Sequence, residues 1–253
     1  MSNDTSRGTI VITGASSGLG EEMARQFAGL GYDLALCARR TGRLEGVREE
    51  ILADHPDRRV EVAALDVTDD DAVFQVFHDF TGRFGTIDRV IVNAGQGKGA
   101  PVGTGRYDAN RETAMTNFVG ALAQSEAAME IFRAQGHGHL VLVSSMSALR
   151  GMRRSMTTYA ATKAGVAAIA EGLQSERVPG VDVSVVYPGY IRSEMNEQVA
   201  QRTKFMVDTE TGVRAMVDAI EKRRAKAYVP SWPWVPIGVA MRALPLSLVR
   251  KLA

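Results

Sequence analysis

The sequence contains a single cysteine, no long apolar run and no excess of either charge. Cys37 is alone among 253 residues, so a disulfide within the chain is impossible and a reducing cytoplasm is favoured. Residues 1–8 lack the apolar core of a secretion signal, and no apolar stretch is long enough to span a bilayer. Lys and Arg (30) balance Asp and Glu (29), which argues against a nucleic-acid partner. We therefore expect a cytoplasmic protein, with Cys37 buried in a strand.

Short apolar runs alternate with longer helical patterns along the chain. The predicted strands are 9–13, 33–38, 60–65, 87–92, 139–144, 181–187 and an edge strand at 227–229, and the predicted helices are 18–30, 41–53, 69–84, 110–134 and 157–174. Continuous Val, Ile and Leu runs between helices indicate a parallel sheet covered on both faces. Right-handed crossovers then give a Rossmann-like, doubly wound α/β fold of mainly seven strands. Without linkers or repeats, we expect one domain over residues 1–253.

A glycine-rich loop lies between the first predicted strand and the first predicted helix. It reads Thr13-Gly14-Ala15-Ser16-Ser17-Gly18-Leu19-Gly20. Glycines permit a tight turn and a close approach of backbone to phosphate, and the helix N-terminus favours an anion. In the first βαβ unit this pattern predicts a dinucleotide site. We assign its contacts to Gly14, Ser16, Ser17, Gly18, Leu19 and Gly20.

The second predicted strand is followed by Arg39 and Arg40, with no Asp or Glu nearby. An NAD site usually places a carboxylate here for the ribose hydroxyls, whereas guanidinium groups suit a 2′-phosphate. We therefore expect NADP(H) in preference to NAD(H), with Arg39 making the main contact. The alternative is a pair of solvated arginines at a helix entry.

The third and fourth predicted strands also end in residues suited to a nucleotide. Asp66 could accept the adenine amino group with Val67 against the ring, or Asp66 and Thr68 could simply cap the next helix. The small segment after the fourth strand could lie against a ribose: Asn93, Ala94 and Gly95.

Tyr159 and Lys163 lie one turn apart in an Ala-rich predicted helix, so their side chains share a face. A phenol titrates near pH ~10, and a neighbouring ammonium stabilises its ionised form. The spacing alone is common on solvated helices. The glycine-rich loop upstream favours a catalytic pair.

With these motifs in order, the chain resembles the short-chain dehydrogenase/reductase superfamily in its single-domain form. The resemblance extends from about Thr9 to Met195. It rests on the TGxxxGxG loop at 13–20, the NAG segment at 93–95, YxxxK at 159–163 and a PGxxxT-like segment at 188–193, where Ser193 replaces Thr.

The resemblance implies a four-residue catalytic group and no metal. Tyr159 would be the acid/base and would also contact the cofactor. Lys163 would be its electrostatic partner and a ligand of the nicotinamide ribose, and Asn117 the anchor of a water in a proton relay. Ser145 matches the catalytic serine, one residue further from Tyr159 than is usual, and Ser147 is the alternative. Hydride transfer to a carbonyl leaves negative charge on oxygen, which hydroxyl donors stabilise. The nicotinamide end would contact Pro188, Gly189, Ile191 and Ser193.

Three segments should surround the substrate: the loop after Gly95, residues 148–158 and the region after Gly189. A lid helix is expected at 194–206, within a lid region around 190–210. The arginines of the second segment could meet an acidic substrate or an acyl-carrier group, or be solvated at the surface: Arg150, Arg153 and Arg154.

The apolar tail, residues 230–253, could pack on the sheet edge, form a subunit contact or lie at a membrane interface. Pro236 and Pro245 interrupt any long helix, which favours the first two. The resemblance further implies a homodimer or homotetramer, with helices 110–134 and 157–174 in the main interface.

The expected function is an NADP(H)-dependent oxidoreductase acting on a small-molecule carbonyl or secondary alcohol. The apolar lid and tail favour a hydrophobic ketone, ketoacyl or lipid-like substrate. One alternative is oxidation of a small polar hydroxy acid by the same mechanism, and another is a non-catalytic NADP(H)-binding sensor or scaffold. Epimerisation or dehydration of a nucleotide sugar would usually need a larger C-terminal domain.

Overall fold

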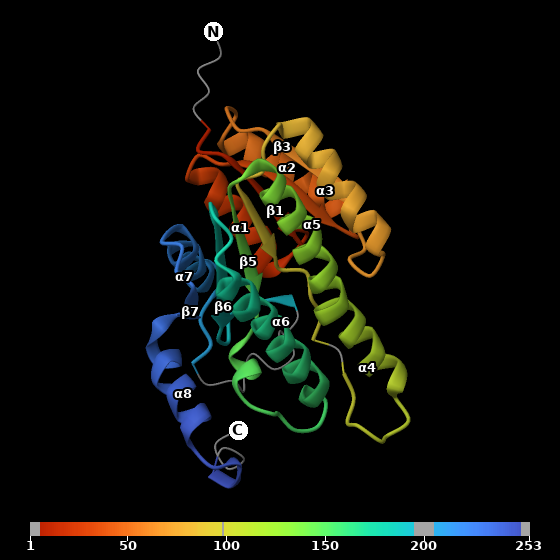
Figure 1. Ribbon diagram of the computed structural model, residues 1–253, viewed down its shortest axis with the longest axis vertical. Helices are drawn as coiled ribbons and strands as arrows, with labels where there is room; N and C mark the ends of the chain where they lie inside the picture. The colour runs from red at the N-terminus through yellow and green to blue at the C-terminus, as the bar shows by residue number, and fades with distance from the viewer. Residues whose placement is uncertain (1–5, 98, 195–204, 249–253) are drawn as a thin grey trace.

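A single parallel sheet forms the centre of the computed structural model, which describes residues 6–97, 99–194 and 205–248. The sheet has seven strands in the order β3-β2-β1-β4-β5-β6-β7 (Figure 1). The predicted strands agree with the observed ones to within two residues at each end, and the doubly wound α/β fold is confirmed. The strands are β1 (Thr9–Thr13), β2 (Asp33–Ala38), β3 (Val60–Ala64), β4 (Arg89–Val92), β5 (Gly138–Val143), β6 (Val181–Pro188) and β7 (Lys226–Val229).

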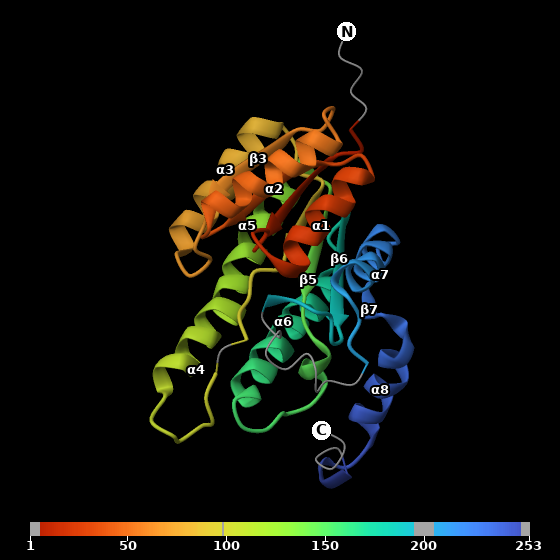
Figure 2. The ribbon, with the colours of Figure 1, turned by 180° about the vertical axis from the view of Figure 1, so that it is seen from behind.

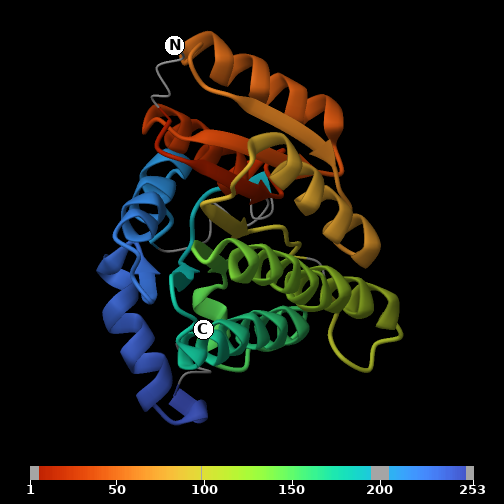
Figure 3. The ribbon, with the colours of Figure 1, turned by 45° about the horizontal axis from the view of Figure 1, so that its top comes forward.

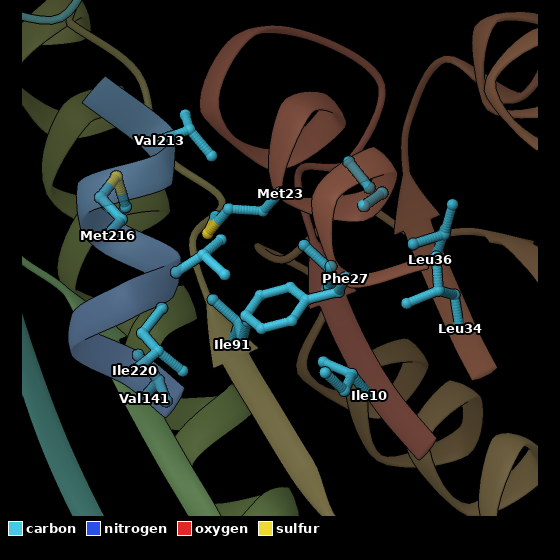
Figure 4. Packing of buried hydrophobic residues seen from close by; sticks show 14 of the residues in the cluster. Ile10, Met23, Phe27, Leu34, Leu36, Ile91, Val141, Val213, Met216 and Ile220 are labelled. Atoms are coloured by element: carbon cyan, nitrogen blue, oxygen red, sulfur yellow. The ribbon is translucent and has the colours of Figure 1, made fainter. Parts of the chain in front are cut away.

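Helices cover both faces of the sheet because its central strands are apolar on both sides. One face carries α1 (Gly18–Gly29), α2 (Thr41–Asp54) and α7 (Thr209–Glu221), and the other carries α3 (Asp70–Phe84), α5 (Gly120–Gln135) and α6 (Met156–Glu176) (Figures 1 and 2). Figure 4 shows the core of the first face, where Met23 and Phe27 of α1 pack between the sheet and α7. Cys37 is buried as expected, and burial raises the pKa of its thiol to about 12.

The helix predicted at 110–134 is not one regular α-helix. It consists of α4 (Tyr107–Ala114), a π-helical segment η1 (Met115–Val119) and α5. Gly120 follows η1 and packs against the backbone of Val67, in the loop after β3. A Cβ on Gly120 would lie 2.5 Å from the Val67 carbonyl oxygen. Figure 3 shows α5 and α6 side by side below the sheet. The π-segment, a feature often found at functional sites, turns one helix face toward the loop after β4.

The alternative in which Asp66 and Thr68 only cap the third helix is wrong. Asp69 is the capping residue, and its side chain accepts a hydrogen bond from the Ala72 N–H at 3.1 Å. Asp66 is instead held by Thr68, whose N–H and hydroxyl donate to Oδ1 at 3.0 and 2.8 Å. Its role toward a nucleotide therefore stays open.

The tail packs on the domain through α8 (Ser231–Ala243). Trp234 is buried against Gly189, where a Cβ would lie 2.0 Å from the indole. The backbone leaves helical geometry at Trp232, so Pro236 falls in the first turn of the regular part and is tolerated. Arg150 donates to the Leu244 carbonyl oxygen at 3.0 Å, which ties the segment after β5 to the end of α8.

Two further expectations concern the lid helix and membrane-spanning helices. The predicted lid helix at 194–206 falls largely outside them, and Phe205 and Met206 at its end are not helical. Among the described residues, no helix combines the length and the apolar character needed to cross a bilayer.

Candidate active site

A cleft opens at the carboxyl edge of the sheet, where the loops after β1, β2, β3, β4, β5 and β6 converge. It brings together nearly all of the residues assigned from the sequence. Its lining includes Gly14, Ser16, Ser17, Gly18, Leu19, Arg39, Arg40, Asp66, Val67, Asn93, Ala94, Gly95, Ser145, Tyr159, Lys163, Pro188, Gly189, Ile191 and Ser193. Gly20 and Asn117 lie behind this lining rather than in it.

The glycine-rich loop is held by close backbone contacts. Gly14 has a left-handed backbone with φ of 65°, and a Cβ on it would lie 2.9 Å from the Ala94 Cα. A Cβ on Gly20 would lie 2.4 Å from the Gly14 carbonyl oxygen, so this residue allows the helix to pack under the loop. Thr13 Oγ1 accepts hydrogen bonds from the Asn93 and Ala94 N–H groups, each at 3.0 Å. Gly14 and Gly20 therefore let the loop lie directly against the loop after β4 and the start of α1.

Cations and hydroxyls gather at the end of the cleft near β2. Arg40 Nη2 donates to Ser17 Oγ at 2.6 Å, and its Nε donates to Ser16 Oγ at 3.4 Å. Nη2 also donates to the Glu194 carboxylate at 3.0 Å. Arg39 lines the same end and forms no ion pair among the described residues. Its rank above Arg40 as a phosphate contact stays a prediction.

The opposite end contains the hydroxyl groups and the lysine. Tyr159 and Lys163 both line this end of the cleft from α6, and Ser145 lies close enough to the Tyr159 hydroxyl to lower its pKa. Ser145 Oγ also accepts from the Ser147 N–H at 3.1 Å, which begins the short helix η2 (Met146–Leu149). Ser144 points away, because its hydroxyl donates to the Lys163 carbonyl oxygen at 2.8 Å. Of the three serines, Ser145 faces the tyrosine.

Burial sets the protonation of this pair. It raises the pKa of the Tyr159 phenol, the hydrogen bond with Ser145 lowers it, and the neighbouring Tyr190 raises it. Burial also lowers the pKa of the Lys163 ammonium to about 8. Lys163 Nζ donates to the Val143 carbonyl oxygen at 2.9 Å. The expectation that Lys163 lowers the phenol pKa is therefore wrong for this structure, in which the pKa is raised and Lys163 is not among the causes. A lowering with an oxidised nicotinamide in place stays a prediction.

Asn117 lies in η1 and joins it to the loop after β4. Its Oδ1 accepts from the Gln96 N–H at 2.7 Å, and its Nδ2 donates to the Gln96 carbonyl oxygen at 2.8 Å. The side-chain amide is thus paired with backbone. This contact holds Gly95, where a Cβ would lie 3.2 Å from Asn117 Oδ1 and 3.4 Å from Lys163 Nζ. The expected water contact remains untested.

Sequence reasoning missed two side chains at the cleft. Glu194 lines it and pairs with Arg40 and Arg43. Tyr190, beside Tyr159, packs edge-on against Trp234 with ring centroids 5.5 Å apart. The spacing in the sequence carried no signal for these contacts, which join distant segments.

These features fit a dinucleotide. A glycine-rich loop that leads into a helix N-terminus accommodates a pyrophosphate. Cations and hydroxyls lie at one end of the cleft, and a buried lysine lies with Tyr159 and Ser145 at the other. Fold and cleft together define a dinucleotide-binding oxidoreductase. The family model for short chain dehydrogenase matches residues 8–204. The chain belongs to this family, whose members are NAD(P)-binding oxidoreductases.

Individual relatives agree with this assignment. An uncharacterized oxidoreductase of Mycobacterium tuberculosis is 48% identical over 254 residues, covering 100% of both chains. An alcohol dehydrogenase of Thermococcus sibiricus, solved with 5-hydroxy-NADP, is 26% identical with a TM-score of 0.75 over 87% of this chain and 94% of that one. A short chain dehydrogenase/reductase of Burkholderia phymatum, solved with NAD, has a TM-score of 0.84 over 98% and 96% at 20% identity, which supports the fold alone.

Proposed function

We propose that this chain is an NADP(H)-dependent carbonyl reductase or secondary alcohol dehydrogenase, with Tyr159 as its acid/base. The observation that carries the proposal is that Tyr159, Ser145 and Lys163 line one end of a cleft whose other end holds the glycine-rich loop. Two hydroxyls that converge beside a buried ammonium suit a reaction in which charge develops on one oxygen. Residues 1–253 would form one catalytic domain.

In the proposed mechanism, NADPH supplies a hydride to the carbonyl carbon when it is bound. Tyr159 delivers a proton to the carbonyl oxygen, and the Ser145 hydroxyl donates a hydrogen bond to the same atom. Lys163 has three hydrogens, and among the described residues only the Val143 carbonyl accepts one. The others would bind the nicotinamide ribose, and the positive charge would favour the Tyr159 phenolate after proton transfer. Alcohol oxidation uses the same groups in reverse.

The preference for NADP(H) over NAD(H) rests on the cluster after β2. Arg39 and Arg40 stand at the rim with the Ser16 and Ser17 hydroxyls, and no carboxylate follows β2 directly. Guanidinium groups match a dianionic phosphate better than neutral ribose hydroxyls do. A 2′-phosphate would therefore be bound at this end.

The proposed substrate is a hydrophobic ketone, ketoacyl or lipid-like compound. Tyr190 is 39% exposed, lies beside Tyr159 and is held by the buried Trp234. An aromatic wall of this kind favours apolar groups over a small polar acid. Arg150, which could have met an acidic group, is half-buried and bound to the Leu244 carbonyl.

We further propose a cytoplasmic homodimer or homotetramer that joins through α5 and α6. Leu122 of α5 is 40% exposed, which suits a helix face that meets a partner.

The test of the function is a panel of ketones and alcohols assayed with each cofactor. Reduction or oxidation is followed by the absorbance of the reduced nicotinamide. Turnover of an apolar ketone, faster with NADPH than with NADH, is expected. Absence of turnover across the panel, with NADPH bound, would favour the non-catalytic sensor instead.

A further inference from the structure

Glu194 occupies the position where the cofactor's distinguishing phosphate is expected. It follows the PGxxxT-like segment after β6 and lines the cleft together with Arg40 and Ser17. Its carboxylate accepts a hydrogen bond from Arg40 Nη2 at 3.0 Å, and its second oxygen accepts from Arg43 Nη1. A residue distant in sequence thus places a negative charge on the cations that are assigned to a phosphate.

We propose that Glu194 is a cofactor-specificity residue that competes with a 2′-phosphate for Arg40, so the protein holds NADP(H) less tightly than its arginines alone would allow. The inference rests on the proposed NADP(H) site. It concerns one property of that site, which is its selectivity for a phosphate over a hydroxyl at the 2′ position.

The hydrogen bonds of Arg40 explain the competition. Each Nη nitrogen of a guanidinium carries two hydrogens. Those of Nη2 are directed to Ser17 Oγ at 2.6 Å and to Glu194 at 3.0 Å, so this nitrogen has no further hydrogen to donate. A phosphate that binds there must displace the carboxylate. A phosphate that binds elsewhere on the same guanidinium still meets the repulsion of a nearby negative charge.

The carboxylate is ionised at neutral pH, since Arg43 and Arg40 lower the pKa of Glu194. A ribose hydroxyl at the same place meets no such repulsion. Glu194 should therefore act against the phosphate and leave NAD(H)-type ligands unaffected. Both side chains are about half exposed, at 45% for Arg40 and 48% for Glu194, so the effect is moderate and depends on salt.

Two nucleotide fragments isolate this effect without catalysis. Adenosine 2′,5′-bisphosphate and adenosine 5′-monophosphate share the 5′-phosphate that meets the glycine-rich loop and differ only at the 2′ position. Isothermal titration calorimetry gives a binding ratio, the Kd of the monophosphate divided by the Kd of the bisphosphate, for the wild type, E194Q and E45Q. A higher ratio means a stronger preference for the 2′-phosphate. Glu45 is the matched control, because it pairs with Arg48 on the same helix α2 and its side chain is also 48% exposed.

E194Q should tighten binding of the bisphosphate by about 1.5- to fivefold, the range for loss of exposed charge pairs. Binding of the monophosphate should stay at its wild-type value, which also shows that the variant is folded. E45Q should match the wild type. The gain in E194Q should shrink at 1 M salt, where the Debye length is about 3 Å.

An unchanged ratio in E194Q overturns the competition, as does a lower ratio, which would mean that Glu194 orients Arg40 for the phosphate. An equal gain in E45Q overturns it too, because the effect would then be general charge. The wild-type ratio tests the NADP preference separately. A ratio near one in the wild type that rises in E194Q refutes the NADP preference and supports the competition by Glu194. A wild-type preference for the bisphosphate that E194Q leaves unchanged supports the NADP preference and refutes the competition.

Discussion

Replacing Tyr159 by Phe removes one oxygen from the proposed acid/base and little else. The ring remains on the same face of α6, so no cavity larger than a hydroxyl is formed. Ser145 loses its contact with the phenol but keeps the hydrogen bond from the Ser147 N–H at 3.1 Å. Lys163 keeps its bond to the Val143 carbonyl at 2.9 Å. We expect the free energy of unfolding to change by less than about 1 kcal/mol.

The same oxygen has two roles in the proposed reaction. A positioned general acid contributes about 10²- to 10⁴-fold, and one donor to a developing oxyanion contributes about 10²- to 10³-fold. Because one group performs both, the factors do not simply multiply. Tyr159→Phe should therefore lower kcat/KM by at least ~10³-fold, about 4 kcal/mol of transition-state stabilisation.

The assay compares steady-state rates on the best ketone of the panel with NADPH affinity measured by fluorescence. NADPH affinity should stay within about twofold, since the glycine-rich loop and Lys163 are unchanged. Tyr107→Phe is the control, because Tyr107 is 76% exposed and lies outside the cleft. A Tyr159→Phe protein that binds NADPH and keeps more than about a tenth of wild-type kcat/KM, a loss under 1.4 kcal/mol, would refute the acid/base assignment.

Four further outcomes follow from the structure. Arg39→Ala should erode most of the NADPH preference in kcat/KM, and equal efficiencies with both cofactors in the wild type would contradict the arginine argument. Burial lowers the pKa of His139 to about 3. When the pH falls below the ordinary histidine pKa of 6.5, His139 is protonated in the unfolded chain and stays neutral in the folded one, so the unfolded state is favoured. Urea unfolding should lose ~2 kcal/mol between pH 7 and pH 5, and His139→Gln should show a shallower loss; equal slopes would exclude this histidine. Gly120→Ala should destabilise the fold by about 1–3 kcal/mol, because its Cβ would lie 2.5 Å from the Val67 carbonyl oxygen; an unchanged thermal midpoint would show that η1 relaxes. Light scattering should give a dimer or tetramer, and a clean monomer would contradict the proposed interface.

The sheet and most of the cleft were predictable because they depend on local signals. Continuous apolar runs bounded by turn residues identify buried strands, and parallel strands bring their carboxyl ends to one edge. Motifs that follow different strands, such as the glycine-rich loop and Asn93-Ala94-Gly95, must then meet. The helical spacing of Tyr159 and Lys163 likewise fixed their common face before any tertiary contact was known.

Other features depend on contacts between distant segments. A π-segment adds one residue to a turn without changing the apolar pattern, so residues 110–134 gave no sign of η1. Several acidic residues preceded the third helix, and only the backbone geometry singles out Asp69 as its cap. Glu194 meets Arg40 and Arg43 across more than 150 positions of sequence. No spacing rule covers such a pair.

The opposite edge of the same sheet carries a polar cluster that was also unforeseen. Arg89, at the start of β4, is 4% exposed, donates through Nε to His139 Nδ1 at 3.0 Å and through Nη1 to Glu221 at 2.7 Å. Since an arginine can only donate, His139 Nδ1 is an acceptor, and Nε2 carries the hydrogen that goes to Ser184 Oγ at 2.8 Å. Tyr32 and the exposed Arg7 complete the partners of Glu221.

The two edges differ in the partners of their buried cations, since Arg89 is paired with a carboxylate and Lys163 is bound to a backbone carbonyl. At the amino edge both ring nitrogens of His139 and both oxygens of Glu221 have partners, as a purely structural network requires. At the carboxyl edge Lys163 is 6% exposed, yet its three hydrogens have one acceptor among the described residues. A buried ammonium with unmet donors is costly unless a ligand supplies the acceptors. Lys163 thus differs from the ion-paired Arg89 at the amino edge, in agreement with its proposed role as a ligand of the nicotinamide ribose.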